Sequence, residues 1–115
     1  MNLFDALKRL NELLPERIWE VRSIGGKVYW QVSAGLDTYS GADDRTAALA
    51  MLEYALREEI EARGWGWIVQ VSDSQGTYDG FVSIPYAYCF NAYGDSPAHA
   101  LALALIEALE TDHRG

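Results

Sequence analysis

The chain has 115 residues, of which half are hydrophobic and 23% are charged, a composition that indicates one globular domain and excludes long disordered segments. Seventeen acidic and nine basic side chains give a formal net charge of −8. Nucleic acid binding depends on Lys and Arg that neutralise phosphates, so we expect no direct nucleic-acid partner. A basic protein would be attracted instead, although the same charge also keeps a small domain soluble.

The single cysteine, Cys89, excludes an internal disulfide and fits a reducing compartment. It lies in an aromatic run, residues 86–90, and we expect it to be a small buried hydrophobe. The N-terminus carries charges and lacks the apolar core of a signal peptide. The longest uncharged helical stretch, residues 96–106, is too short to span a membrane. We therefore expect a cytoplasmic protein with no membrane contact.

The first predicted element is a helix over residues 3–14. Four leucines recur at spacings of three and four, which places them on one helical face: Leu3, Leu7, Leu10 and Leu14. Asn2 is the expected N-cap. Pro15 ends the helix, because the residue before a proline avoids the α region.

Two strands and a long helix follow. Residues 18–24 and 28–34 form the strands, and Gly25-Gly26 between them is typical of a tight hairpin turn. We expect residues 35–41 to be a loop. Asp43 or Asp44 then caps a helix that runs to about residue 62 and stops at Gly64.

The second half repeats this order. Residues 65–73 alternate as a strand, residues 74–80 read as a polar turn, and residues 81–90 form one further strand. Pro85 indicates that this strand lies at a sheet edge or carries a bulge. Ser96 and Pro97 are typical of a helix start, and the last helix, apolar nearly all round, runs to about residue 110.

The internal repeat sets the predicted fold. Residues 48–53 (Ala-Leu-Ala-Met-Leu-Glu) resemble residues 102–107 (Ala-Leu-Ala-Leu-Ile-Glu). We predict an α+β fold of order α-ββα-ββα, in which a four-stranded, mainly antiparallel sheet packs with two long helices and an N-terminal helix. The chain is one domain, 1–115, made of the N-terminal helix (1–15) and two ββα units (18–63 and 65–110).

Several of these residues resemble the phage ABA sandwich domain family, small proteins encoded by bacteriophages and prophages. The resemblance covers residues 18–110. It depends on Tyr39-Ser40 before the first long helix and on residues 92–98 (Ala-Tyr-Gly-Asp-Ser-Pro-Ala) before the Ala-rich last helix. The N-terminal helix does not match. The resemblance implies a phage protein in the cytoplasm of a bacterial host, and it brings no catalytic residues.

Neither catalysis nor metal binding is predicted. The two histidines, His99 and His113, form no cluster of metal-ligand spacing with cysteine or acidic residues. Gly64-Trp65-Gly66 lacks the further glycine and the helix start of a phosphate loop. We therefore expect no enzyme activity, no metal and no cofactor.

Acidic and aromatic side chains are the candidates for a partner-binding surface. We select two groups: Glu58, Glu59 and Glu61 on the long helix, and Asp73, Tyr78, Asp79 and Tyr86 in the second hairpin. Clustered carboxylates would imitate phosphates and occupy a basic groove, and tyrosines would anchor a partner. The simpler alternative is a solvated helix face.

These features predict a non-enzymatic phage accessory protein that binds and inhibits or redirects a host protein. A nucleic-acid-handling or defence component such as a CRISPR effector would fit, which makes an anti-defence role the leading hypothesis. One alternative is a small-ligand or nucleotide-binding module that uses aromatic side chains on the sheet. The other is a structural phage component that self-associates, for example as a homodimer.

Overall fold

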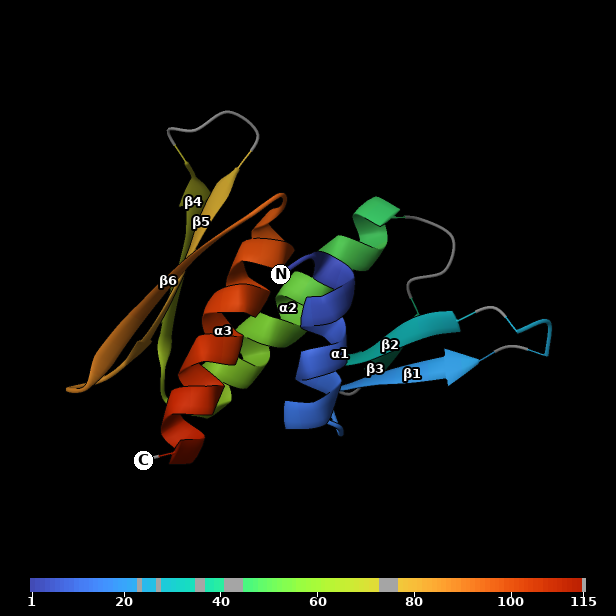
Figure 1. Ribbon diagram of the computed structural model, residues 1–115, viewed down its shortest axis with the longest axis horizontal. Coiled ribbons are helices and arrows are strands. Elements are labelled where there is room, and N and C mark those ends of the chain that lie inside the picture. The colour runs from blue at the N-terminus through green and yellow to red at the C-terminus, as the bar shows by residue number, and fades with distance from the viewer. Residues whose placement is uncertain (23, 27, 35–36, 41–44, 73–76, 115) are drawn as a thin grey trace.

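The computed structural model is an α+β protein in which three helices lie between two small sheets (Figure 1). It describes residues 1–22, 24–26, 28–34, 37–40, 45–72 and 77–114. One helix is followed twice by three strands and a helix: α1 (Leu3–Leu13), β1 (Ile18–Arg22), β2 (Val28–Ala34), β3 (Asp37–Ser40), α2 (Arg45–Ala62), β4 (Gly66–Val71), β5 (Tyr78–Ile84), β6 (Tyr88–Gly94) and α3 (Pro97–Arg114).

The strands form two separate antiparallel sheets, each with its strands in chain order. The expected α+β class is confirmed, but the single four-stranded sheet is wrong. Each half of the chain makes its own three-stranded sheet, β1-β2-β3 or β4-β5-β6. The repeated unit is therefore βββα and not ββα. The sheet β4-β5-β6 lies alongside α3, whereas the strands of β1-β2-β3 run outward from α1 and α2 on the other side (Figure 1).

Each half contains one strand that the sequence did not predict. The expected loop of residues 35–41 contains β3, whose four residues pair with the end of β2. The expected long strand of residues 81–90 is two strands, because the chain reverses at Pro85 and the Ala87 N–H donates to the Ile84 carbonyl at 3.1 Å. Tyr78 to Gly80, expected in a turn, belong to β5, and β6 continues to Gly94.

The predicted caps at Asn2, Gly64 and Ser96 agree with the structure. The Asn2 side chain accepts from the Asp5 N–H at 2.8 Å, and Gly64 after α2 has a φ of +76°. Ser96 Oγ accepts from the His99 N–H at 3.1 Å before α3, which runs to Arg114, past the expected end. The predicted caps Asp43 and Asp44 lie outside the described residues.

Helix α3 is the centre of the core. It contacts the sheet β4-β5-β6 on one side and α1 and α2 on the other. Its residues are small or apolar on nearly every face, as the sequence predicted, and most are buried: Ala98, Ala100, Leu101, Ala102, Ala104, Leu105, Ile106, Ala108 and Leu109. Among the residues that the structure describes, no helix is both long and apolar enough to cross a membrane.

Two glycines set how closely α3 approaches its sheet. A Cβ atom added to Gly80 of β5 would lie 2.6 Å from the carbonyl carbon of Ala100, and one added to Gly94 of β6 would overlap the Ala100 backbone nitrogen. The alanines of α3 and these glycines therefore pack backbone against backbone. A larger residue at either glycine would push the helix away from the sheet.

We expect Gly94→Ala to lower the free energy of unfolding by about 2 kcal/mol, because the added methyl group meets backbone atoms that cannot rotate away. Gly66→Ala is the matched control: there the added atom meets only the Ser83 hydroxyl, a side-chain atom that can turn. Denaturant titration of both variants measures the difference. Equal effects of the two substitutions would contradict the close helix–sheet contact.

Candidate functional site

The turn between β5 and β6 presents the most exposed aromatic side chain among the described residues. Tyr86 has a relative exposure of 110%, and Pro85 and Ala87 beside it are also exposed. The turn is closed by the hydrogen bond between Ala87 and Ile84. Pro85 fixes the second turn position, and the third, Tyr86, has a φ of +62°. This is the arrangement of a type II turn.

The conformation of Tyr86 is unfavourable for its residue type. The third position of such a turn favours Gly or Asn, because a positive φ brings Cβ close to the backbone. A bulky residue there costs about 1 kcal/mol. The fully exposed ring gains no burial that would offset this cost in the isolated chain. Strain combined with exposure points to a role for the tyrosine outside the fold.

Other apolar side chains lie beside the turn. Tyr88 is 60% exposed, and its ring centroid is 6.0 Å from that of the half-buried Phe90. Cys89 is exposed on strand β6, so the expectation that it is buried is wrong. Its neighbours in sequence do not cover it, because successive side chains of a strand point to opposite faces. We call residues 84–90 the hairpin tip.

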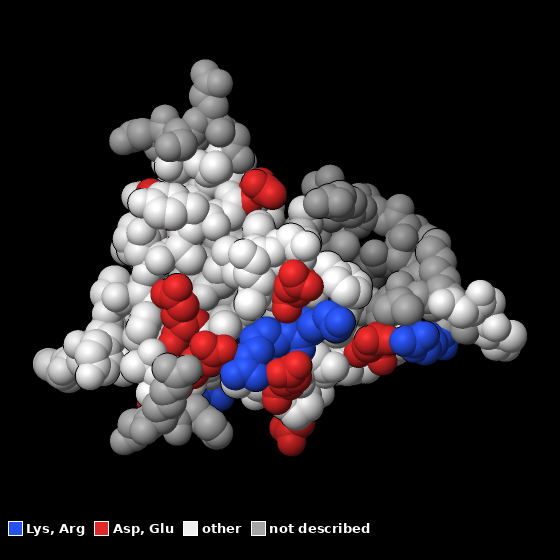
Figure 2. Space-filling view, viewed as in Figure 1, with Lys and Arg blue, Asp and Glu red and all other residues white. Residues whose placement is uncertain are grey.

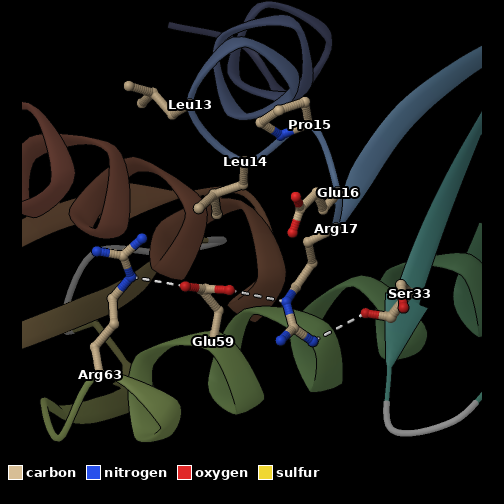
Figure 3. Close-up of a pocket in the computed structure, with 8 residues that line it drawn as sticks. All are labelled: Leu13, Leu14, Pro15, Glu16, Arg17, Ser33, Glu59 and Arg63. Atoms are coloured by element: carbon tan, nitrogen blue, oxygen red, sulfur yellow. Dashed lines mark hydrogen bonds and ion pairs between the residues drawn. The ribbon is translucent and has the colours of Figure 1, made fainter.

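Glu58 and Glu59, two of the predicted acidic residues, belong to a group of ion pairs around Arg17, which we call the Arg17 junction. Figure 3 shows Arg17 and Glu59. Arg17 lies between α1 and β1. Its Nη1 is 2.7 Å from Glu58 Oε1 and 3.1 Å from the Ser33 carbonyl oxygen, and its Nε is 3.0 Å from Glu59 Oε1. Glu59 also accepts from Arg63 Nε at 2.7 Å. The junction therefore joins α2 to strand β2 and to the start of β1.

This junction is partly buried, with 19% of the Arg17 side chain and 15% of the Glu59 side chain exposed. Burial acts to lower the pKa of Arg17, but the hydrogen bonds from its guanidinium to Glu58 and Glu59 outweigh burial and raise the pKa above its ordinary value. The guanidinium therefore stays charged at any physiological pH. Glu58 and Glu59 neutralise it, so they do not act as free negative charges for a partner.

A pocket of about 460 Å³ opens at the junction. Its lining combines apolar and charged side chains: Leu13, Leu14, Pro15, Glu16, Arg17, Ser33, Glu59 and Arg63. Three of its charged groups pair with one another, with Glu59 between the guanidinium groups of Arg17 and Arg63 (Figure 3). These pairings neutralise the buried charges of the pocket, which we therefore interpret as a structural joint.

The remaining predicted residues do not form one patch. Glu61 Oε1 accepts from Trp67 Nε1 at 3.3 Å, and Asp79 Oδ2 accepts from Gln70 at 3.4 Å. Tyr78 begins β5 and is partly buried, whereas Tyr86 follows the other end of that strand. Asp73 lies outside the described residues. Of the predicted set, Tyr86 alone belongs to the hairpin tip.

Trp30 and Trp67 pack partly buried against the core. Trp67 is also covered by Arg57, whose guanidinium lies 5.0 Å from the ring centroid. Phe4 meets Trp30 edge to face at 6.2 Å. These rings are occupied by neighbours within the chain, which leaves little of their faces to stack on a ligand.

His99, in the first turn of α3, has a structural role. It is buried, its Nδ1 accepts from the Asp95 N–H at 3.1 Å, and its Nε2 lies 3.0 Å from the Met1 carbonyl oxygen. Because Nδ1 accepts, the ring hydrogen is on Nε2, which donates to Met1. Within the described ranges, no group of three or more His, Cys, Asp or Glu residues could hold a metal ion.

Comparison with known proteins gives no match: no family model, no curated protein and no solved structure is significantly similar to this chain. The resemblance to the phage ABA sandwich domain therefore stays a prediction.

Sequence reasoning missed the Arg17 junction and the turn at Tyr86. The junction joins residues more than 40 positions apart, and no local pattern marks such a contact. The Pro85-Tyr86 turn had a local signal, a proline inside an alternating strand. That signal is ambiguous, because proline is also found at strand edges and bulges.

We expect Arg17→Met to lower the free energy of unfolding by about 2 kcal/mol, because it leaves two adjacent carboxylates without their cation. Arg17→Lys should cost about half as much, since lysine keeps the charge but lacks the guanidinium fork. The pKa of Arg17 is higher in the folded chain than in the unfolded chain. The contribution of Arg17 to stability is therefore complete at any pH below its unfolded-state pKa, and it is lost only as the pH rises through its folded-state pKa. The difference between wild type and Arg17→Met should therefore be constant from about pH 7 to 10.

Arg22→Met is the control for this measurement. Arg22 also has an acidic neighbour, Glu20 at 3.2 Å, but 72% of its side chain is exposed. Removal of such a surface pair should change stability by less than about 0.5 kcal/mol. Denaturant unfolding of the three variants would contradict the junction if Arg17→Met were as mild as Arg22→Met.

Proposed function

We propose that this chain is a non-catalytic protein-binding module that contacts its partner through the hairpin tip. The observation that carries the proposal is Tyr86, a strained and fully exposed tyrosine at a turn position suited to Gly or Asn. Tyrosine is among the residues that contribute most to protein interfaces, because it buries a large rigid ring and keeps one polar group.

The rigidity of the turn supports the same proposal. Pro85 restricts the backbone before Tyr86, and the hydrogen bond from Ala87 to Ile84 closes the turn. An anchor that is held in place loses little conformational entropy when it binds. Tyr88 and Phe90 extend the apolar surface along the adjoining strand.

The acidic charge has a different part in this proposal from the one the sequence predicted. Glu58 and Glu59 are paired with arginines, so they are not assigned to the contact itself. The net charge of −8 would still attract a basic partner over a distance and raise the association rate at low salt. A host protein, an anti-defence role and a phage origin stay predictions that this proposal is compatible with.

Photo-crosslinking tests the proposal. Tyr86 is replaced by p-benzoylphenylalanine, the chain is expressed in bacterial cells, and irradiated lysates are searched for a covalent adduct with another protein. Ile24 is the matched control position, because it is 109% exposed at the hairpin of the other sheet. We expect one defined adduct from position 86 that is absent from position 24. The same adducts from both positions, or none from position 86, would sink the proposal.

Tyr86→Asn separates binding from stability. Asparagine tolerates a positive φ, so we expect the free energy of unfolding to stay equal or to rise by up to about 1 kcal/mol. Loss of the ring should weaken binding of the crosslinked partner about 30-fold, as for an interface tyrosine worth about 2 kcal/mol. Denaturant unfolding and a titration with purified partner measure the two effects. A clear loss of stability would mean that Tyr86 serves the fold.

A further inference from the structure

Strand β6 is an edge of its sheet and lacks the usual protection of an edge. Among the residues that the structure describes, it pairs with β5 alone, and its seven residues (Tyr-Cys-Phe-Asn-Ala-Tyr-Gly) include no charge and no proline. Exposed edges normally carry charges, prolines or bulges, because unpaired N–H and C=O groups readily add another strand. The edge strand β1 of the other sheet follows this rule with Glu20 and Arg22. The β6 edge is therefore suited to accept a strand.

We infer that β6 pairs antiparallel with β6 of a second copy of this chain. Side chains that face each other in such a pair lie on the same side of the sheet. With Asn91 on the two-fold axis, Phe90 faces Ala92 of the second copy and Tyr88 faces Gly94 of the second copy. On the helix side, Gly94 lies against Ala100 of its own α3. The complementarity of this register therefore lies on the outer side, where the small, exposed Cys89 faces the exposed Tyr93 of the second copy.

Charge favours a second copy at this edge. Two chains that each carry −8 repel each other over most of their surfaces. In Figure 2, the surface over β6 at the left is largely uncharged, while Lys, Arg, Asp and Glu gather over the helices beside it. Two copies therefore approach with the least repulsion along β6. A basic partner would gain nothing from an edge without carboxylates.

The other edge of this sheet, β4, is a poorer place for the same contact. It is also uncharged, but α2 lies against it, and Trp67 of β4 bonds to Glu61 and lies under Arg57. Pairing of β4 with a second copy would bring two such helices together beside the paired strands. Glu53 is paired with Arg57 there, so Glu61 supplies the like charge that opposes association.

Pairing through β6 yields one continuous six-stranded sheet. Two-fold symmetry closes the assembly, so no further copy adds at β6. Tyr86 lies beyond the paired residues, and the two Tyr86 turns end up at opposite ends of the interface, roughly 33 Å apart by strand geometry. Tyr88 and Phe90 of the hairpin tip belong to the paired strand, but Tyr86 takes no part in the pairing, so the inference does not depend on the proposed contact through Tyr86.

Light scattering after size-exclusion chromatography tests the dimer. We expect twice the mass of one chain at high protein concentration and a tighter dimer at higher salt, because salt screens the repulsion between the copies. Asn91→Lys places two like charges face to face and should weaken the dimer about tenfold. Gln70→Lys, the same charge change on the β4 edge, is the control and should leave it intact. A monomer at every concentration and salt would overturn the inference, as would dissociation by Gln70→Lys alone.

Disulfide trapping tests the register. In the double variant Cys89→Ser/Asn91→Cys, the two introduced thiols face each other across the axis, within reach of a disulfide. We expect a covalent dimer under mild oxidation. Cys89→Ser/Ile68→Cys, with its thiol on β4, should remain monomeric in a non-reducing gel. Trapping of the β4 variant without the β6 variant would overturn the inference. Circular dichroism of each variant confirms that it is folded, and the wild-type mass provides the readout that needs no substitution.

Discussion

The close contact between α3 and the strands β5 and β6 determines how the rest of the molecule is arranged. Gly80 and Gly94 let the backbone of Ala100 approach the sheet without intervening side chains. Because α3 is built from alanine and leucine on nearly all sides, its opposite face remains apolar and takes up α1 and α2. Those helices carry the sheet β1-β2-β3. One small-residue contact thus permits the three helices of the described residues to lie between the two sheets.

This arrangement leaves the proposed contact surface at the periphery of the molecule. The helices lie between the two sheets, while the sheet β4-β5-β6 keeps its outer face and its β6 edge turned away from them (Figure 1). Charged groups near the centre form ion pairs between elements, as in the Arg17 junction, where Glu58 and Glu59 join α2 to the first sheet. What remains for a partner is backbone at the edges and side chains at the turns.

The sequence predicted the features that depend on local physics. The helices were recognised from leucine spacing and from caps such as Asn2 and Ser96, each of which makes the expected hydrogen bond. The strands β3 and β6 were missed for two reasons. A four-residue strand offers no measurable alternation, and a turn at Pro85 looks like an interrupted strand. Similarly, Tyr86 could be selected as an aromatic candidate, but its positive φ arises only once the turn is formed.

Two features that lower the stability of an isolated chain, a strained turn and an unprotected strand edge, both lie on the β5–β6 hairpin. Tyr86 carries backbone strain at its turn, and β6 leaves its edge unprotected. Each feature would weaken an isolated hairpin, but here the glycine contacts fix the hairpin to the most buried helix of the protein. A firmly held platform tolerates local strain and presents its groups with little loss of entropy on binding. The stability of α3 is therefore what allows the hairpin to keep residues suited to recognition.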